Sequence, residues 1–242
     1  EGLQHQDGHS LIQASTIPNC VAYDPAYAYE LAVIVQDGMC RMVQEQESCF
    51  YYITAMNENY LQPAMPEGAA QGILKGMHRV QTGEGPGGSD AGNAGPRVQL
   101  LGAGAILREA LAAAGLLARD FDVAADVWSV TSFNELRREG MDCERWNMLH
   151  PEAEPRQSFV AAQLAETAGP VVAATDYMRT YADQIRPYVP RRYTVLGTDG
   201  FGRSDMRSQL RKFFEVNRYY IALAALKALA DDGEIPVAKV SQ

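Results

Sequence analysis

No run of apolar residues in this sequence approaches the length of about 20 that a membrane-spanning helix needs. The first ten residues, EGLQHQDGHS, also lack the basic and apolar regions of a secretory signal peptide. Basic residues are scarce, because 30 acidic side chains outnumber 21 basic ones and the two kinds are mixed along the chain. A nucleic-acid-binding protein would instead show a basic face. We therefore expect no membrane and no nucleic acid among the partners.

Cysteines with the spacing of metal ligands are missing as well. Cys20, Cys40, Cys49 and Cys143 form no C-x-x-C pair. Reduced thiols in a cytoplasmic protein are the simplest interpretation, and a disulfide or a zinc site are the alternatives. What the sequence does have is apolar content: 47% of its 242 residues, enough for a large core in one or two domains.

From residue 97 onward, strand-like and helix-like segments alternate. Apolar runs such as RVQLLG, ADVWSV, PVVAATD and YTVLG are each followed by a stretch with helical features. Regular alternation with apolar strands requires crossover connections, and so predicts an α/β fold with a mostly parallel sheet covered on both faces. Ser132 and Glu135 predict a capping box at the start of one of these helices.

The first 80 residues are less regular. Asp24 and Pro25 have the residue types of an N-cap and a first helical position, and predict a helix of about five turns after them. The segment 48–57, SCFYYITAMN, predicts a buried strand, and AAQGILKGMHRVQ a short helix that runs into a strand. Between the two parts, TGEGPGGSDAGNAGP has no large apolar side chain, so we expect residues 81–96 to be a flexible linker between two domains.

Two glycine-containing turns are candidate ligand sites. Gly102 and Gly104 lie between a strand and a helix, but Leu107 occupies the third glycine position of the dinucleotide-binding fingerprint, which favours a plain tight turn. In GTDGFGRSD (197–205), Arg203 could clamp an anion, balanced by Asp199 and by Asp205. Asp205 could equally be a carboxylate at a helix N-terminus.

The four histidines differ in their surroundings. His78 and His150 lie in apolar or proline-flanked segments and are expected to be structural. His5 and His9 lie in a glycine-containing polar stretch with no apolar periodicity. An imidazole titrates near neutral pH and can act as a general acid or base there, so this pair is the candidate catalytic group. From composition alone, a solvated terminal tail is the competing interpretation.

Long blocks of the chain resemble one family. GLQHQDGHS, YDPAYAYELAVIVQDG, YYITAMNENYLQPAMPEG, DVWSVTSFNELRREGMDCERWNMLHP and GTDGFGRSD are similar to the homodimeric type of pyruvate dehydrogenase E1 component. The resemblance implies that residues 1–80 are the end of the pyrimidine-binding middle domain. It implies that residues 97–242 are a transketolase-like carboxyl-terminal domain. The linker at 81–96 is longer and looser than the family's usual connection.

The resemblance also implies chemistry. Members of the family are oxidoreductases of a multienzyme complex that use thiamine diphosphate and magnesium to decarboxylate pyruvate. They then reductively acetylate the lipoyl group of dihydrolipoyl acetyltransferase (E2). The family has an active-site histidine in the GLQH block, which is His5 here, and His9 is the weaker candidate. The principal ligands of the cofactor and its magnesium lie upstream in the family, so no cofactor-binding or metal-binding residue is assigned in this chain.

Two functions therefore stay open. The chain is part of a cytoplasmic, homodimeric E1 enzyme and is inactive by itself, or it is a non-catalytic structural or dimerisation module of a transketolase-like enzyme.

Overall fold

The computed structural model describes residues 6–83 and 95–241, and its centre is a five-stranded sheet. Strand order is β3-β5-β4-β6-β7. All pairs are parallel except that of β3 with β5, which is antiparallel. The predicted mostly parallel sheet is thus confirmed. Its strands are β3 (Met77–Gln81), β4 (Arg97–Gly102), β5 (Ala124–Val130), β6 (Val171–Ala174) and β7 (Tyr193–Leu196).

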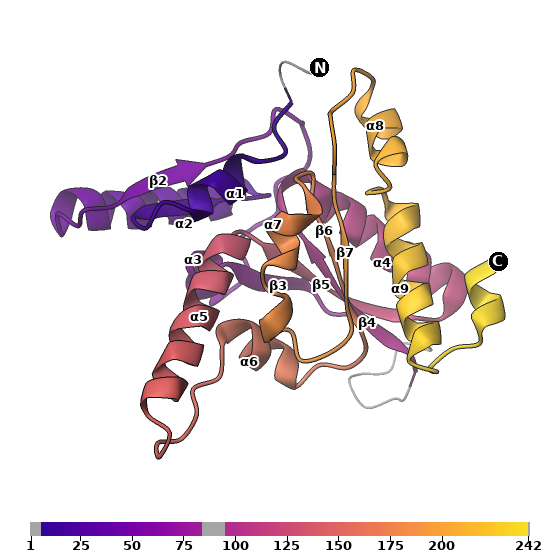
Figure 1. Ribbon diagram of the computed structural model, residues 1–242. Coiled ribbons are helices and arrows are strands. Elements are labelled where there is room, and N and C mark those ends of the chain that lie inside the picture. Colours follow the sequence, from indigo (N-terminus) through magenta and orange to yellow (C-terminus); the bar gives the residue numbers. More distant parts are fainter. Residues whose placement is uncertain (1–5, 84–94, 242) are drawn as a thin grey trace.

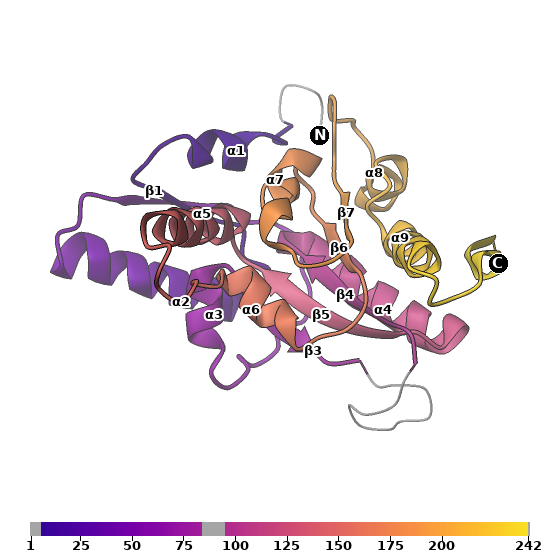
Figure 2. The ribbon, with the colours of Figure 1, turned by 60° about the horizontal axis from the view of Figure 1, so that its bottom comes forward.

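Helices cover both faces of this sheet (Figures 1 and 2). One face packs against α4 (Leu107–Phe121) and α9 (Arg218–Asp231). The other face packs against α5 (Phe133–Leu149), α6 (Phe159–Ala165) and α7 (Arg179–Asp183). Because both faces are covered, the inner strands are mostly apolar, and every residue of β5 is buried.

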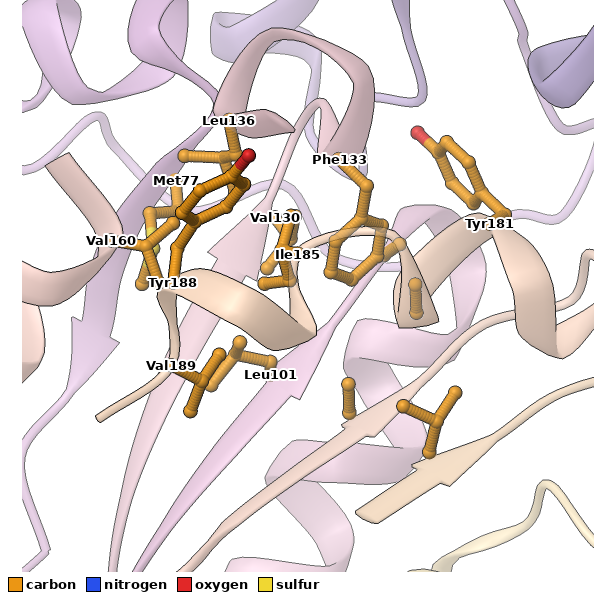
Figure 3. Packing of buried hydrophobic residues seen from close by; sticks show 14 of the residues in the cluster. Met77, Leu101, Val130, Phe133, Leu136, Val160, Tyr181, Ile185, Tyr188 and Val189 are labelled. Carbon is orange, nitrogen blue, oxygen red and sulfur yellow. The ribbon is translucent and has the colours of Figure 1, made fainter. Parts of the chain in front are cut away.

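The core on the α5–α7 face is shown in Figure 3. Leu101 from β4 and Val130 from β5 belong to the same buried cluster as Phe133, the first residue of α5. The Phe133 ring meets Tyr181 of α7 edge-on, with ring centroids 5.1 Å apart. This packing joins α5 and α7 to the sheet and so fixes the loops at its carboxyl edge.

The first part of the chain forms a smaller unit around a two-stranded parallel sheet. A third hydrophobic cluster, which includes Val21, Tyr23, Ile34 and Ile73, joins the strands to the helices of this unit. Its elements are α1 (Ser10–Ser15), β1 (Cys20–Tyr23), α2 (Ala28–Met39), a π-helical turn η2 (Cys40–Gln44), β2 (Phe50–Ile53) and α3 (Ala69–Lys75). The short elements of the second part are 3₁₀ turns η3 (Gly104–Ile106), η4 (Arg186–Tyr188) and η5 (Val237–Ser241), and helix α8 (Arg207–Phe213).

The predicted start of α2 at Asp24 and Pro25 is wrong, because α2 begins at Ala28. The buried Asp24 carboxylate accepts a hydrogen bond from Thr54 Oγ1 (2.7 Å) instead of capping a helix. The backbone amides of Ala26 and Tyr27 are satisfied by Glu30, at 2.6 and 3.0 Å. The predicted length is close, since α2 and η2 together run from residue 28 to 44.

Three further predictions need correction. The β2 strand exists, but Phe50 is 41% exposed, since β1 alone pairs with β2 within the described residues. At the start of α5, Ser132 Oγ accepts from the amide of Glu135 (3.0 Å), but the Glu135 carboxylate pairs with Arg138 instead of completing a capping box. The helix expected after β6 ends at Asp183, and a 3₁₀ turn, η4, follows; its Pro187 has no amide hydrogen with which to continue an α-helical ladder.

Strand β3 connects the first part of the chain to the larger sheet. It lies at the end of the segment 1–80, pairs with β5, and has Met77 and His78 buried. Hydrogen bonding thus joins the end of this segment to the second unit. Most of the predicted linker, residues 84–94, lies outside the described residues, and the boundary within 81–96 stays a prediction.

Candidate functional site

The segment that follows His5 is anchored on the carboxyl edge of the large sheet. The amide of Met178, after β6, donates to the carbonyl oxygen of Gly8 (3.1 Å). The amide of Gly202, after β7, donates to Oε1 of Gln6. In Figures 1 and 2 the described start of the chain accordingly lies beside the long loop between β7 and α8. Two segments nearly 200 residues apart in sequence are therefore held together at the edge where α/β proteins commonly bind ligands.

Asp7 shapes this opening loop. Its Oδ1 accepts hydrogen bonds from the amides of His9 (3.2 Å) and Ser10 (3.0 Å), and its Oδ2 accepts from Ser10 Oγ. Helix α1 begins immediately afterwards. The exposed His9 side chain sits at the N-cap position and has no hydrogen-bond partner among residues 6–83 and 95–241. His5 lies outside the described residues, so its catalytic role stays a prediction.

The GTDGFGRSD loop follows β7 as predicted, but its charges pair differently from the expected clamp. Asp199 accepts from the backbone amide (2.9 Å) and Nε (2.7 Å) of Arg179. The Arg203 guanidinium lies 4.9 Å from the ring centre of Phe213 instead of between two aspartates. Asp205 accepts from the amide of Met206 just before α8, which agrees with a carboxylate at a helix N-terminus.

The glycines of LGAGAI permit close packing, as the tight-turn interpretation predicts. A Cβ on Gly102 would lie 2.6 Å from Cα of Leu107, at the start of α4. Gly104 has φ +49°, and a Cβ there would lie 2.7 Å from the Asp24 carboxylate. This turn therefore brings α4 and the first unit together with little space for a dinucleotide phosphate.

The remaining histidines are structural or exposed. Nε2 of the buried His78 lies 2.7 Å from Glu30 Oε1, and Glu30 also accepts from Ser129 Oγ (2.6 Å). His150 is exposed and stacks on Trp146, with centroids 4.5 Å apart. Neither imidazole lies in the opening loop, so the candidate catalytic pair is unchanged.

Behind the GTDGFGRSD loop is a cavity of about 200 Å³. Its acidic lining residues are Asp176, which follows β6, and Glu58, which comes from the loop after β2. Burial is the largest cause that raises the pKa of Asp176 to about 6, and Arg211 opposes the shift. For Glu58, burial is outweighed by the hydrogen bond and charge of Arg211 and by the charge of Arg108, which hold its pKa below the usual value.

Sequence reasoning missed this charged cluster. Glu58 accepts from Arg108 (2.7 Å) and from Arg211 (2.6 Å), and Glu109 accepts from the backbone and side chain of Arg218 (2.9 Å each). The only local signal is the four-residue spacing of Arg207 and Arg211, which places both side chains on one face of α8. Its carboxylate partners come from other elements.

The described residues hold no cluster of side chains that marks a place for the magnesium of thiamine diphosphate. Magnesium prefers several oxygen ligands around one centre. Among residues 6–83 and 95–241, no group of three His, Cys, Asp or Glu side chains could hold a metal ion. The four cysteines are free thiols. In the same described part, no helix is long and apolar enough to cross a membrane.

Comparisons with known proteins extend the sequence resemblance. Residues 1–63 match the sequence model of the pyruvate dehydrogenase E1 component middle domain, and residues 88–217 match that of the transketolase-like TK C-terminal domain. The chain is 60% identical over 236 residues to the pyruvate dehydrogenase E1 component of Pseudomonas aeruginosa. It is 58% identical over 242 residues to that of Cupriavidus necator.

These alignments cover 97% and 100% of the chain but only 26% of each relative. The chain thus spans about a quarter of the length of the curated relatives it matches. Among solved structures, a transketolase from Leishmania mexicana aligns over 97% of this chain and 29% of its own, with a TM-score of 0.62 and 17% identity. That similarity shows the fold alone. Together the matches confirm the resemblance and the fold class.

Proposed function

Because the chain belongs to the transketolase-like C-terminal domain family, we propose that it acts as part of the E1 component of a pyruvate dehydrogenase complex. That enzyme decarboxylates pyruvate with thiamine diphosphate and magnesium and reductively acetylates the lipoyl group of E2. Its partners are then a second E1 subunit and the E2 lipoyl domain, and its compartment is the cytoplasm. The strong similarity to bacterial E1 components over the whole chain supports this proposal.

The anchored opening loop is the observation that carries the catalytic part of the proposal. Gly8 and Gln6 are bonded to the segments after β6 and β7, so the chain is fixed directly after His5. A general acid or base must be held in place to be effective. His5 is therefore proposed to move protons at the substrate, and His9, which is exposed at the start of α1, is the weaker candidate.

The cofactor and its metal are proposed to bind mainly through residues of the complete enzyme outside this chain. Thiamine diphosphate would supply the electron sink for decarboxylation. The residues described here would hold the opening loop in place through the segments that follow β6 and β7. The chain alone is then inactive.

A non-catalytic structural or dimerisation module is the second candidate, and it has an observation in its favour. Several large apolar side chains of the first unit are exposed: Met39 by 63%, Val43 by 68% and Leu61 by 94%. Where such side chains form a contiguous patch, another protein surface often covers them. If the chain serves only assembly, replacing His5 should not change turnover.

Calorimetric titration of the chain with thiamine diphosphate and magnesium tests whether the principal cofactor ligands lie elsewhere. We expect no tight, magnesium-dependent binding and no decarboxylation of pyruvate, because the principal ligands of the cofactor and its metal are proposed to lie outside this chain. The complete enzyme serves as the positive control. Micromolar, magnesium-dependent affinity in the chain alone would contradict the proposal.

A further inference from the structure

A second cavity, of about 880 Å³, lies beside the first and outside the proposed catalytic loop. It is formed by the starts of α4 and α9, by α8, and by the loop that carries Glu58. Small-molecule sites in proteins commonly have volumes of about 300–1,000 Å³. The cavity is therefore of a size that holds a small ligand.

Positive charge is concentrated in the lining of this cavity. Its charged members are five cations, against two carboxylates: Arg108, Arg207, Arg211, Lys212 and Arg218, with Glu58 and Glu109. The lining therefore carries an excess of three positive charges, in a chain whose net charge is -9. A concave surface lined with one sign of charge attracts ligands of the opposite sign.

The two carboxylates do not use up the donors of the cations. Glu109 is engaged by Arg218 and lies 3.7 Å from Arg211. Glu58 is shared by Arg108 and Arg211, and Arg207 lies 3.8 Å from it and donates to Asn57 Oδ1. Each guanidinium has five N–H donors, so most remain available after these contacts. The exposed Lys212 has no carboxylate within 4.0 Å in the described part of the chain.

Aromatic rings lie in the same lining. Tyr219, at the start of α9, is 66% exposed, and Tyr220 is half-buried beside it. An exposed aromatic face can stack on a flat ring of a ligand. Cations with an adjacent aromatic surface suit a molecule that combines phosphate groups with a planar ring.

We propose that this cavity binds a small ligand with a diphosphate group, held by Lys212, Arg207 and Arg218. Three excess positive charges match the two to three negative charges of a diphosphate. Arginine forks donate pairs of hydrogen bonds to phosphate oxygens, and lysine adds a point charge. The concave shape and limited volume favour a small molecule over an acidic protein segment.

Calorimetry of the chain with pyrophosphate and with adenosine diphosphate, without magnesium, tests the proposal. We expect both to bind at low salt and to bind more weakly at high salt, because ions screen the attraction. A tighter adenosine diphosphate complex would support contact of the ring with the tyrosines, and equal affinity would support a site for the phosphates alone. Added magnesium should weaken binding, since it neutralises the ligand, unlike at a site built around a metal.

Two lysine variants make the test specific to this cavity. Lys212→Ala removes a charge from the lining and should weaken pyrophosphate binding about fivefold. Lys227→Ala is the matched control, because it removes the same charge from the exposed outer surface of α9, where Lys227 pairs with Asp231. It should change the affinity by less than about twofold. Both side chains are exposed, so circular dichroism should show both variants folded.

The proposal is overturned if neither phosphate binds, or if Lys212→Ala and Lys227→Ala have the same effect. Tighter binding of a polyglutamate peptide than of either phosphate would also overturn it, in favour of an acidic protein partner. None of these outcomes depends on pyruvate decarboxylation, so the result is independent of the proposed E1 role.

Discussion

At the residue scale, Asp24 is a carboxylate in a place that disfavours its charge. Its side chain is 2% exposed and accepts a hydrogen bond from Thr54. Burial, together with the charges of Asp176 and Glu30, raises the pKa of Asp24 to about 7, and the Thr54 bond opposes this only in part. The folded protein therefore holds the Asp24 proton more tightly than the unfolded chain does.

We predict that Asp24→Asn removes part of the pH dependence of stability. Since the folded pKa is raised, the stabilising contribution of the protonated form is present near pH 4 and is lost as the pH rises to about 7. When the pH rises from 5 to 8, the unfolding free energy of the wild type should fall by about 2–3 kcal/mol more than that of the variant. Urea denaturation at both pH values measures this. If the unfolding free energies of the variant and the wild type changed equally between pH 5 and pH 8, the pKa of Asp24 would not be raised in the folded state.

Glu30 and His78 form a buried pair that joins α2 to β3, and its loss should be costly. His78→Ala leaves the Glu30 carboxylate buried with one donor fewer, which should lower the unfolding free energy by about 3 kcal/mol. His150→Ala is the control, because that imidazole is exposed, and should change it by less than about 0.5 kcal/mol beyond the lost stacking on Trp146. Chemical denaturation at pH 7 compares them. If His78→Ala and His150→Ala lowered the unfolding free energy equally, the buried pair of Glu30 and His78 would not stabilise the fold as proposed.

At the scale of elements, the strands of the large sheet could be predicted and the start of α2 could not. The run ADVWSV is mostly apolar because β5 is buried on both faces, so its signal is local. Asp24 has the type of an N-cap, but Thr54, thirty residues later, takes its carboxylate. Glu30 then supplies the cap from inside the helix. Such a long-range competition leaves no mark in the local pattern.

Strand β4 and helix α4 each provide one glycine for a matched test. Gly102→Ala would place a Cβ 2.6 Å from backbone Cα of Leu107 and should destabilise the protein by about 1–3 kcal/mol. Gly115→Ala, in the exposed middle of α4, meets no atom within 4 Å and should stabilise it by about 0.5–1 kcal/mol. Thermal denaturation should move the two melting temperatures in opposite directions. A tolerated Gly102→Ala would mean that the turn does not require close packing.

At the scale of the whole molecule, the sequence indicated the two ends of the candidate site without showing their contact. The blocks GLQHQDGHS and GTDGFGRSD were both singled out, and the fold joins them through Gln6 and Gly202. The arginine cluster was missed because its partners are far apart in sequence, as with Arg211 and Glu58, separated by 153 positions. Periodicity reports which face of a helix is buried, but it does not report which distant charge that face meets.

The central claim is that the opening loop places a catalytic histidine in an E1 active site. Its most direct test is the turnover number of the complete enzyme, with a lipoyl acceptor, after His5→Ala and after His9→Ala. Removing a positioned general acid or base should lower kcat by about 100- to 10,000-fold for His5→Ala. Dimerisation and thiamine diphosphate affinity should stay near the wild-type values, because the cofactor is proposed to bind mainly elsewhere. His9→Ala should have a smaller effect on kcat. Near-normal turnover of both variants would contradict the claim and leave the opening loop with a structural role, whereas loss of turnover only in His9→Ala would assign the role to the other imidazole.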